Sequence, residues 1–143
     1  MLNLILTIID FGLLILAWLV QAIIYPSFQY IDRQKLVSWH NRYQRSISYF
    51  VLPLMLLQIA ISFLLMIDNW KFLNIIHFTL ILIIWLSTFL QAVPLHGRIA
   101  NQEELNVTIP KLVKVNLLRT LLWTATFMIS LLLLLENIKF LSA

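Results

Sequence analysis

Ionisable, amide and hydroxyl side chains that could do chemistry stand inside or at the ends of long apolar runs of this sequence. The richest set gathers at one end of the runs: His40, His96, Arg119, Asn116, Gln21, Tyr25, Tyr43 and Gln91. Histidine can exchange a proton near neutral pH, and a guanidinium beside an amide can bind an oxygen atom that carries negative charge. This set predicts a polar pocket for a lipophilic ligand with a polar, quinone-like or aromatic head.

Arg119 is the most unusual member of this set. It follows Asn116 by three residues and precedes Trp123 by four, so the three side chains share one helical face. No carboxylate occurs at the same depth in any apolar run, which leaves a ligand's oxygen atom as a candidate partner for the guanidinium. The alternative is that Arg119 reaches lipid phosphate or helix carbonyls, and that His40 and His96 are ordinary interfacial histidines.

Asp10 and His77 form a second candidate site. Both lie at the end of the runs that is remote from the first set, roughly 9–12 Å deep on that side at about 1.5 Å of rise per residue. An isolated carboxylate in hydrocarbon is expected to take up a proton, whereas a histidine neighbour allows the two groups to share one. The sequence therefore predicts that they are partners, either as a protonatable site or as a contact that only fixes helix packing.

Four apolar runs must position these residues. They cover residues 2–25, 46–67, 72–93 and 112–135, each near the ~20 residues that span ~30 Å of hydrocarbon. A composition of 62% hydrophobic and 11% charged residues excludes an ordinary soluble domain. The chain is thus predicted to be all-α, one domain over residues 1–143, and an integral membrane bundle of four antiparallel helices with a polar interior. We interpret the first run as a retained helix and not as a signal peptide, because it lacks a basic start and contains Asp10.

The polar residues of each run follow a helical stripe, and such stripes face the bundle because unpaired polar groups are costly in lipid. The predicted stripes are Asp10, Leu14, Trp18, Gln21 and Tyr25; His40, Gln44, Ile47, Val51, Leu54 and Gln58; His77, Ile81, Ile84, Thr88 and Gln91; and Asn116, Arg119, Trp123, Thr126 and Ser130. Gln58 and Trp123 complete the predicted ligand-binding set.

Charge sets the predicted orientation. The first and third connections hold seven basic residues, and the other side holds two: Arg33, Lys35, Arg42, Arg45, Arg98, Lys111 and Lys114 against Lys71 and Lys139. The positive-inside rule therefore places these two connections in the cytoplasm and both termini outside, in the cell's inner membrane. Contact with anionic membrane lipid accounts for the net charge of +4, so no nucleic-acid partner is predicted.

Local signals predict the connections. Pro26 should end the first helix, and Pro94 with Gly97 should end the third. Residues 28–39 alternate between apolar and polar types, which predicts an amphipathic segment at the membrane surface before the second helix. Residues 68–71 should form a tight turn, and Thr108 is a candidate cap for the fourth helix.

The sequence limits the cofactors. It has no cysteine, which excludes iron–sulfur clusters and thiolate zinc sites, and no metal site is predicted. Haem between His40 and His96 stays open, although both histidines lie at the ends of their runs. We favour no bound cofactor, and the ligand's identity stays unknown.

Several strings resemble a family of small bacterial four-helix integral membrane proteins of unassigned activity. They are YPSF at 25–28, WHNRY at 39–43, LPLM at 52–55, WLST at 85–88, QAVPLH at 91–96 and NLLRTLLWT at 116–124. The chain departs from this family at Gln58, where a carboxylate is expected, and at Leu117, where a tryptophan is expected. More remotely, it is similar to the anthrone-oxygenase-like membrane proteins.

The remote resemblance implies an oxidoreductase-like or oxygenase-like reaction, the oxidation of a reduced aromatic by oxygen without a bound cofactor. It implies that His40 or His96 takes a phenolic proton and that Arg119 with Asn116 stabilises the oxyanion. The runner-up function is a non-enzymatic subunit that binds lipid or assembles with a membrane protein partner. The third is a proton-coupled small exporter that uses Asp10.

Overall fold

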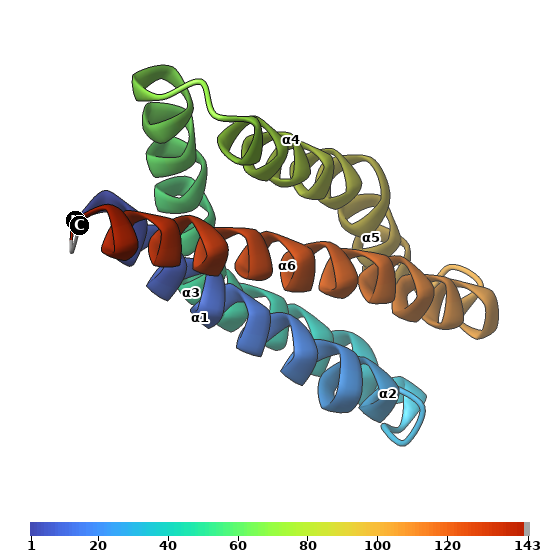
Figure 1. Ribbon diagram of the computed structural model, residues 1–143. Coiled ribbons are helices and arrows are strands. Elements are labelled where there is room, and N and C mark those ends of the chain that lie inside the picture. Colours follow the sequence, from blue (N-terminus) through green and yellow to red (C-terminus); the bar gives the residue numbers. More distant parts are fainter. Residues whose placement is uncertain (142–143) are drawn as a thin grey trace.

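The protein folds into four helical rods that run alternately up and down. The computed structural model describes residues 1–141, with side chains as far as Ile138, so the side chain of Lys139 lies outside the description. In chain order the elements are α1 (Leu2–Leu19), the π-helical turn η1 (Val20–Ile24), α2 (Tyr25–Ser27), α3 (Arg33–Asp68), α4 (Phe72–Ser87), the π-helical turn η2 (Thr88–Ala92), α5 (Val93–Ala100) and α6 (Leu105–Leu141). The first rod is α1, η1 and α2, and the third is α4, η2 and α5 (Figure 1).

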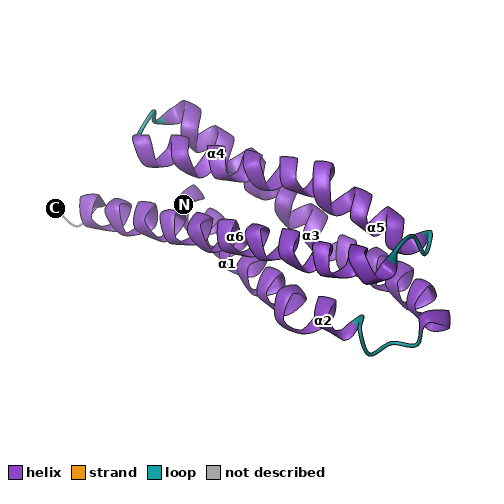
Figure 2. Cartoon of the chain, turned by 90° about the vertical axis from the view of Figure 1, so that its right-hand side faces the viewer, coloured by secondary structure: helices purple, strands orange, loops and turns teal. Residues whose placement is uncertain are grey.

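The rods pack as a square. α1 packs against α6, α6 against α4, α4 against α3, and α3 against α1. The described chain ends and the α3–α4 connection lie at one end of the bundle, here called the terminal end (Figure 2). The α2–α3 and α5–α6 connections lie at the other, here called the loop end. Alternating direction brings residues near the end of one rod and the start of the next to the same level.

All four rods are long and apolar enough to cross a membrane, as predicted. The qualifying helices are Leu2–Ser27, Arg33–Asp68, Phe72–Ala100 and Leu105–Ile138. Large hydrophobic side chains such as Leu56, Phe89 and Leu118 are at least half exposed on the outside of the bundle. A surface of this kind suits hydrocarbon and not water.

The second helix begins earlier than predicted. Residues 33–39, expected in a separate surface segment, are the first two turns of α3. Asp32 explains this start, because its Oδ1 accepts a hydrogen bond of 3.0 Å from the backbone N–H of Gln34. The side chain thus satisfies a backbone donor that the first helical turn would leave unpaired.

Asp32→Ala should therefore lower the free energy of unfolding by about 0.5–2 kcal/mol. Asp32→Asn should keep most of the parent's stability, because the amide oxygen can accept the same hydrogen bond. Reversible unfolding in mixed micelles, followed by circular dichroism, measures both. An alanine variant as stable as the parent would show that Asp32 does not hold the start of α3.

Pro94 and Gly97 do not end the third rod, which continues as α5 to Ala100. Thr108 does not cap the fourth helix either, because α6 begins three residues earlier and the Thr108 Oγ1 donates to the carbonyl of Glu103 at 2.9 Å. The turn before α6 is instead made by Gln102 and Glu104, whose φ angles of 59° and 41° reverse the chain.

Two prolines account for the π-helical turns. Pro26 and Pro94 each stand two residues after such a turn. A proline removes one backbone donor and its ring crowds the carbonyl four residues earlier, here in η1 and in η2. A π turn widens the helix at that carbonyl and inserts one extra residue, so side chains after it rotate by about 100° relative to a continuous α-helix.

Candidate functional site

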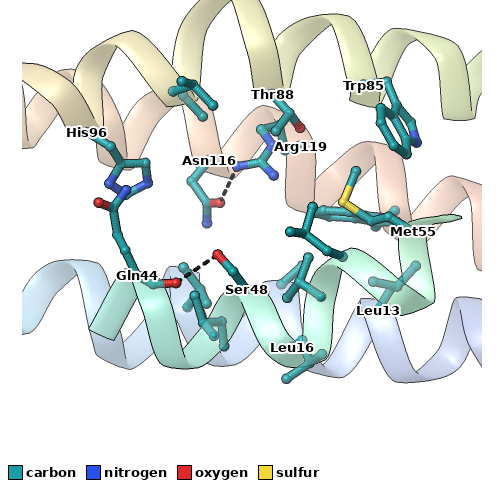
Figure 3. Close-up of a pocket in the computed structure, with 18 of the residues that line it drawn as sticks. Leu13, Leu16, Gln44, Ser48, Met55, Trp85, Thr88, His96, Asn116 and Arg119 are labelled. Carbon is teal, nitrogen blue, oxygen red and sulfur yellow. Dashed lines mark hydrogen bonds between the residues drawn. The ribbon is translucent and has the colours of Figure 1, made fainter. Parts of the chain in front are cut away.

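A cavity of about 310 Å³ lies inside the bundle, between its middle and the loop end. All four rods contribute to its wall (Figure 3). Most of the lining is apolar, and the polar side chains are Tyr25, Tyr43, Gln44, Ser48, Thr88, His96, Asn116 and Arg119, with the indoles of Trp85 and Trp123. The cavity is thus an apolar chamber with polar groups at selected points.

The cavity opens sideways, between α3 and η2. No Cα atom of α3 comes within 8 Å of one in η2, although α3 packs against both α4 and α5. The lining residues Leu52 of α3, Phe89 of η2 and Val93 at the start of α5 are 49%, 54% and 52% exposed. An opening with such a rim leads from the outer, apolar surface of the bundle into its interior.

Arg119 projects into this cavity from α6 and is only 7% exposed. Its Nη1 donates a long hydrogen bond of 3.4 Å to Asn116 Oδ1, and its guanidinium carbon lies 5.2 Å from the centre of the Trp123 ring. Asn116 is held in turn, because its Nδ2 donates to Gln21 Oε1 at 2.9 Å. Among the described side chains no carboxylate forms an ion pair with Arg119.

Three buried N–H groups around the cavity lack a hydrogen-bond partner among the described residues. They are Arg119 Nε, Trp85 Nε1 and Trp123 Nε1. A buried donor without a partner costs about 1–3 kcal/mol, so native proteins rarely keep several of them together. The side chains that carry these donors line the cavity, and Arg119 brings a positive charge to its wall.

A chain of hydrogen bonds leads away from the cavity toward the loop end. The Tyr25 hydroxyl lies 2.9 Å from His96 Nε2, and His96 Nδ1 lies 2.9 Å from His40 Nε2. Tyr25 and His96 line the cavity, whereas His40 is fully buried behind them. Three rods thus supply one member each, from α2, α5 and α3.

The predicted pocket residues fall into three groups. Six of them line the cavity: Tyr25, Tyr43, His96, Asn116, Arg119 and Trp123. Two others, Gln21 and His40, stand behind these and hold Asn116 and His96 by hydrogen bonds. The prediction that the four rods bring polar groups to one common level is confirmed for these eight residues, while their roles stay predictions.

Two predicted ligand-binding residues lie elsewhere. Gln91 is exposed on the outside of the third rod, where its Oε1 accepts from Ser87 Oγ at 3.2 Å. The π turn η2 explains the error, because it rotates Gln91 away and brings Ala92 into the wall. Gln58 belongs to the Asp10 cluster, since it stands 14 residues beyond Gln44 and thus about 21 Å further along α3.

Ser48 and Trp85 line the cavity but were not among the predicted site residues. Helical spacing could have found both. Ser48 follows Gln44 by four residues, and Trp85 precedes Thr88 by three, so each shares a face with a residue of a predicted stripe.

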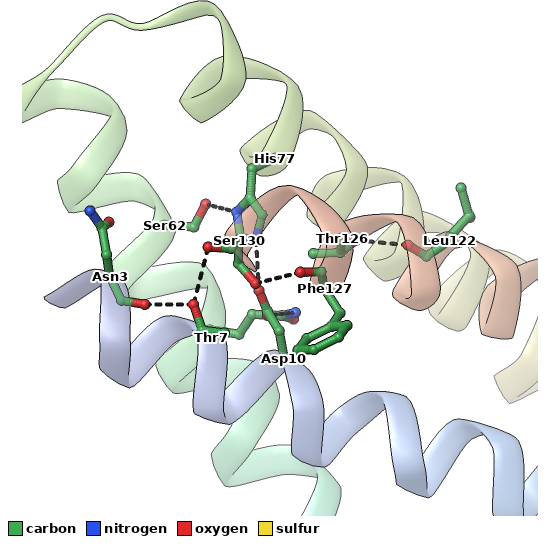
Figure 4. Close-up of polar contacts among 10 residues, drawn as sticks. Asn3, Thr7, Asp10, Ser62, His77, Leu122, Thr126, Phe127 and Ser130 are labelled. Atoms are coloured by element: carbon green, nitrogen blue, oxygen red, sulfur yellow. Dashed lines mark hydrogen bonds and ion pairs between the residues drawn. The ribbon is translucent and has the colours of Figure 1, made fainter. Parts of the chain in front are cut away.

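Asp10 and His77 meet in a separate, fully buried cluster toward the terminal end (Figure 4). Asp10 Oδ2 lies 2.8 Å from His77 Nε2, and Asp10 Oδ1 accepts from Gln58 Nε2 at 2.7 Å. The other ring nitrogen of His77 lies 2.8 Å from Ser62 Oγ. The predicted partnership is confirmed, whereas its use as a proton site stays a prediction.

Apolar packing separates the two polar regions. Leu13 and Met55 form part of the cavity wall, and both are almost fully buried. They stand one helical turn from Asp10 and Gln58, in a hydrophobic cluster with Ala17, Ile84 and Trp123. No hydrogen bond among the described residues crosses this layer to join Asp10 to the cavity.

The metal-ligating side chains of the described residues do not gather in one place. Within the described residues no three side chains of histidine, aspartate or glutamate gather closely enough to hold a metal ion. His40 and His96 are hydrogen-bonded to each other across 2.9 Å, and a haem iron held between them would have to displace that bond. Haem stays an open alternative, and His40 and His96 would have to move apart to hold it.

Comparison with known proteins found no homologue of this chain. No family model, no curated protein and no solved structure matches the chain.

Proposed function

We propose that this protein is an integral membrane protein that binds a lipophilic molecule, with its quinone-like or aromatic head in the cavity beside Arg119. The observation that carries the proposal is Arg119, a buried guanidinium in the wall of an apolar chamber that has no carboxylate partner among the described side chains. A carbonyl or phenolic oxygen of a ligand would accept a hydrogen bond from this guanidinium. A water-soluble ligand would have no use for the apolar lining.

The size and opening of the cavity support a ligand with two parts. A volume of about 310 Å³ is at the lower end of the ~300–1,000 Å³ range of small-molecule pockets, which suits a head of one or two rings. An apolar tail would extend past Leu52 and Phe89 into lipid. Trp85 and Trp123 would contact the flat faces or edges of the rings.

We further propose that the loop end faces the cytoplasm and that both termini lie outside, in the inner membrane. The charge distribution supports this orientation, because all seven basic residues of the first and third predicted connections stand in the parts of α3, α5 and α6 nearest the loop end. The binding cavity then opens toward the cytoplasmic leaflet. An oxidoreductase or oxygenase-like reaction on the bound head goes one step further and stays a prediction.

The decisive test blocks the cavity without altering Arg119, Trp85 or Trp123. In Ser48→Phe a phenyl ring would fill the chamber from α3, whereas Ser46→Phe adds the same ring on the exposed face of α3 two residues away. A lipophilic naphthoquinone should quench the fluorescence of Trp85 and Trp123 in the parent and in Ser46→Phe. Ser48→Phe should show little of this saturable quenching.

Equal quenching in the two variants would overturn the proposal, because the probe would then bind elsewhere. Native mass spectrometry on protein extracted in mild detergent from its own membrane gives an independent readout. A bound aromatic or quinone-like mass would support the proposal. Phospholipid alone would favour the non-enzymatic lipid-binding subunit.

A further inference from the structure

The chain of Tyr25, His96 and His40 has the geometry of a proton path. Both links are 2.9 Å long, and every atom in them is a nitrogen or oxygen that can both give and receive a proton. One end, the Tyr25 hydroxyl, is at the cavity wall, and the other end, His40 Nδ1, is a buried atom without a partner among the described residues. A purely structural chain would not need three members that all exchange protons.

We propose that this chain carries a proton between the cavity and the loop end, and that the ligand is a lipophilic phenol or hydroquinone whose hydroxyl proton it exchanges. The inference rests on the proposed function, which it deepens by naming the ligand class. Arg119 gives the reason why the ligand would release its proton, since the guanidinium lacks an anionic partner among the described side chains. A phenolate oxygen would supply that partner.

The three residues admit two arrangements with the same number of protons. In the first, the Tyr25 O–H donates to His96 Nε2, His96 Nδ1–H donates to His40 Nε2, and His40 Nδ1 carries a proton. In the second, each bond is reversed: His40 Nε2–H donates to His96 Nδ1, His96 Nε2–H donates to the Tyr25 oxygen, and His40 Nδ1 is bare. The Tyr25 O–H then points to the cavity.

Conversion of the first arrangement to the second takes one proton from the ligand and releases one proton at the His40 end of the chain. The ligand hydroxyl gives its proton to the Tyr25 oxygen, and the Tyr25 proton passes to His96 Nε2. The proton on His96 Nδ1 passes to His40 Nε2. The proton on His40 Nδ1 leaves to water of the loop end, which must first reach this buried atom through an opening of the packing around it. The ligand is left as a phenolate beside Arg119, and the reverse sequence returns its proton and restores the first arrangement.

Apolar packing isolates this path. The Phe28 ring lies 5.5 Å from the ring of Tyr25 and 5.7 Å from that of His40, in both cases centre to centre. Leu36, Leu95 and Ile99 are buried in the same cluster as Tyr25. Tyr43 and Arg119, from α3 and α6, are the other ionisable groups at the cavity end. With water excluded from its flanks, the proton's favourable route is along the hydrogen bonds.

The experiment uses an alkylated 4-nitrophenol, whose colour reports its ionisation. The probe is bound to the detergent-solubilised protein at low pH, the pH is raised by rapid mixing, and absorbance follows the ionisation of the bound probe. His40→Gln and His40→Phe are the test variants, because His40 does not line the cavity and the glutamine amide keeps a hydrogen bond to His96. Trp39→Phe, the neighbouring position on α3, is the matched control.

Both His40 variants should bind the probe with affinity close to that of the parent and should ionise it at least about tenfold more slowly, because a positioned acid–base group contributes roughly 10²–10⁴-fold to proton transfer. Trp39→Phe should ionise it at the parent's rate. Displacement by excess unlabelled phenol gives the dissociation rate, so that escape of the probe is told apart from proton transfer.

Retained binding with unchanged ionisation rates in both His40 variants would overturn the proton path and leave the proposed function standing. The proton path would also be overturned if, in the parent, the bound probe dissociates before it ionises. Absence of binding to the parent would overturn both proposals.

Discussion

Replacing Asp10 or His77 alone should lower the free energy of unfolding by about 3–5 kcal/mol, whereas replacing both should cost much less than the sum. Each group is 1% exposed or less, and each is the other's partner at 2.8 Å. Asp10→Leu would leave His77 and the amide of Gln58 without their acceptor in an apolar interior. In the same way His77→Leu would leave a carboxylate that only Gln58 contacts.

A double-mutant cycle measures this coupling. Asp10→Leu, His77→Leu and the double variant are unfolded reversibly in mixed micelles, and Thr79→Ala, an exposed position on α4, serves as the control with an expected change near zero. Asp10→Asn should be milder than Asp10→Leu, because the amide can still bond to both neighbours. Strict additivity of the two leucine substitutions would contradict the assigned partnership.

Arg119→Met should change stability and binding in opposite directions. The ligand-free variant should be more stable than the parent by roughly 1 kcal/mol or more, because a buried cation without a counter-ion is replaced by an apolar side chain of similar length. Affinity for a quinone or phenol probe should fall by about 2–5 kcal/mol, which is on the order of 30-fold or greater. A structural arginine would show the reverse pattern.

Arg119→Lys separates charge from geometry. The ammonium keeps the positive charge but lacks the planar fork and its Nε donor, so binding should lie between that of the parent and that of the methionine variant. Unfolding without ligand and titration of tryptophan fluorescence with ligand measure the two quantities on the same preparations. A methionine variant that is less stable and binds normally would contradict the role given to Arg119.

Helical spacing predicted those parts of the site that lie on uninterrupted helices. Asn116, Arg119 and Trp123 are all buried on one face of α6, as their spacing indicates. The meeting of Asp10 and His77 followed from their equal depth in the first and third rods, which run in the same direction. In both cases the only information needed was the rise and the turn of an α-helix.

The same helical arithmetic failed where two steps of four residues followed each other and where the α-helix contains a π-helical turn. The predicted stripe of the first helix took two steps of four from Asp10 to Trp18, which rotates a side chain by about 80° from its start. The structure instead buries Leu13 and Ala17, and Trp18 is 43% exposed. Gln91 was misplaced because a π turn inserts a residue that the sequence pattern does not reveal, although Pro94 marks where it occurs.

The cavity itself could not be predicted from the pattern. Its existence depends on how far α3 stands from η2, and that distance follows from tertiary packing and not from any local signal. The unpartnered state of Trp85 and Trp123 likewise depends on which groups fail to reach them. A sequence can supply donors at the right depth, but only the packed bundle shows that nothing in the described chain accepts from them.

The sideways opening between α3 and η2 changes how occupancy of the site should be counted. A ligand that enters there comes from the bilayer, so its relevant concentration is its mole fraction among lipids and not its amount per litre of water. Partitioning has already removed the ligand from water, and an interaction that is weak by aqueous standards would still keep the cavity filled. Occupancy should therefore fall when the same protein and ligand are diluted with added lipid at constant aqueous volume.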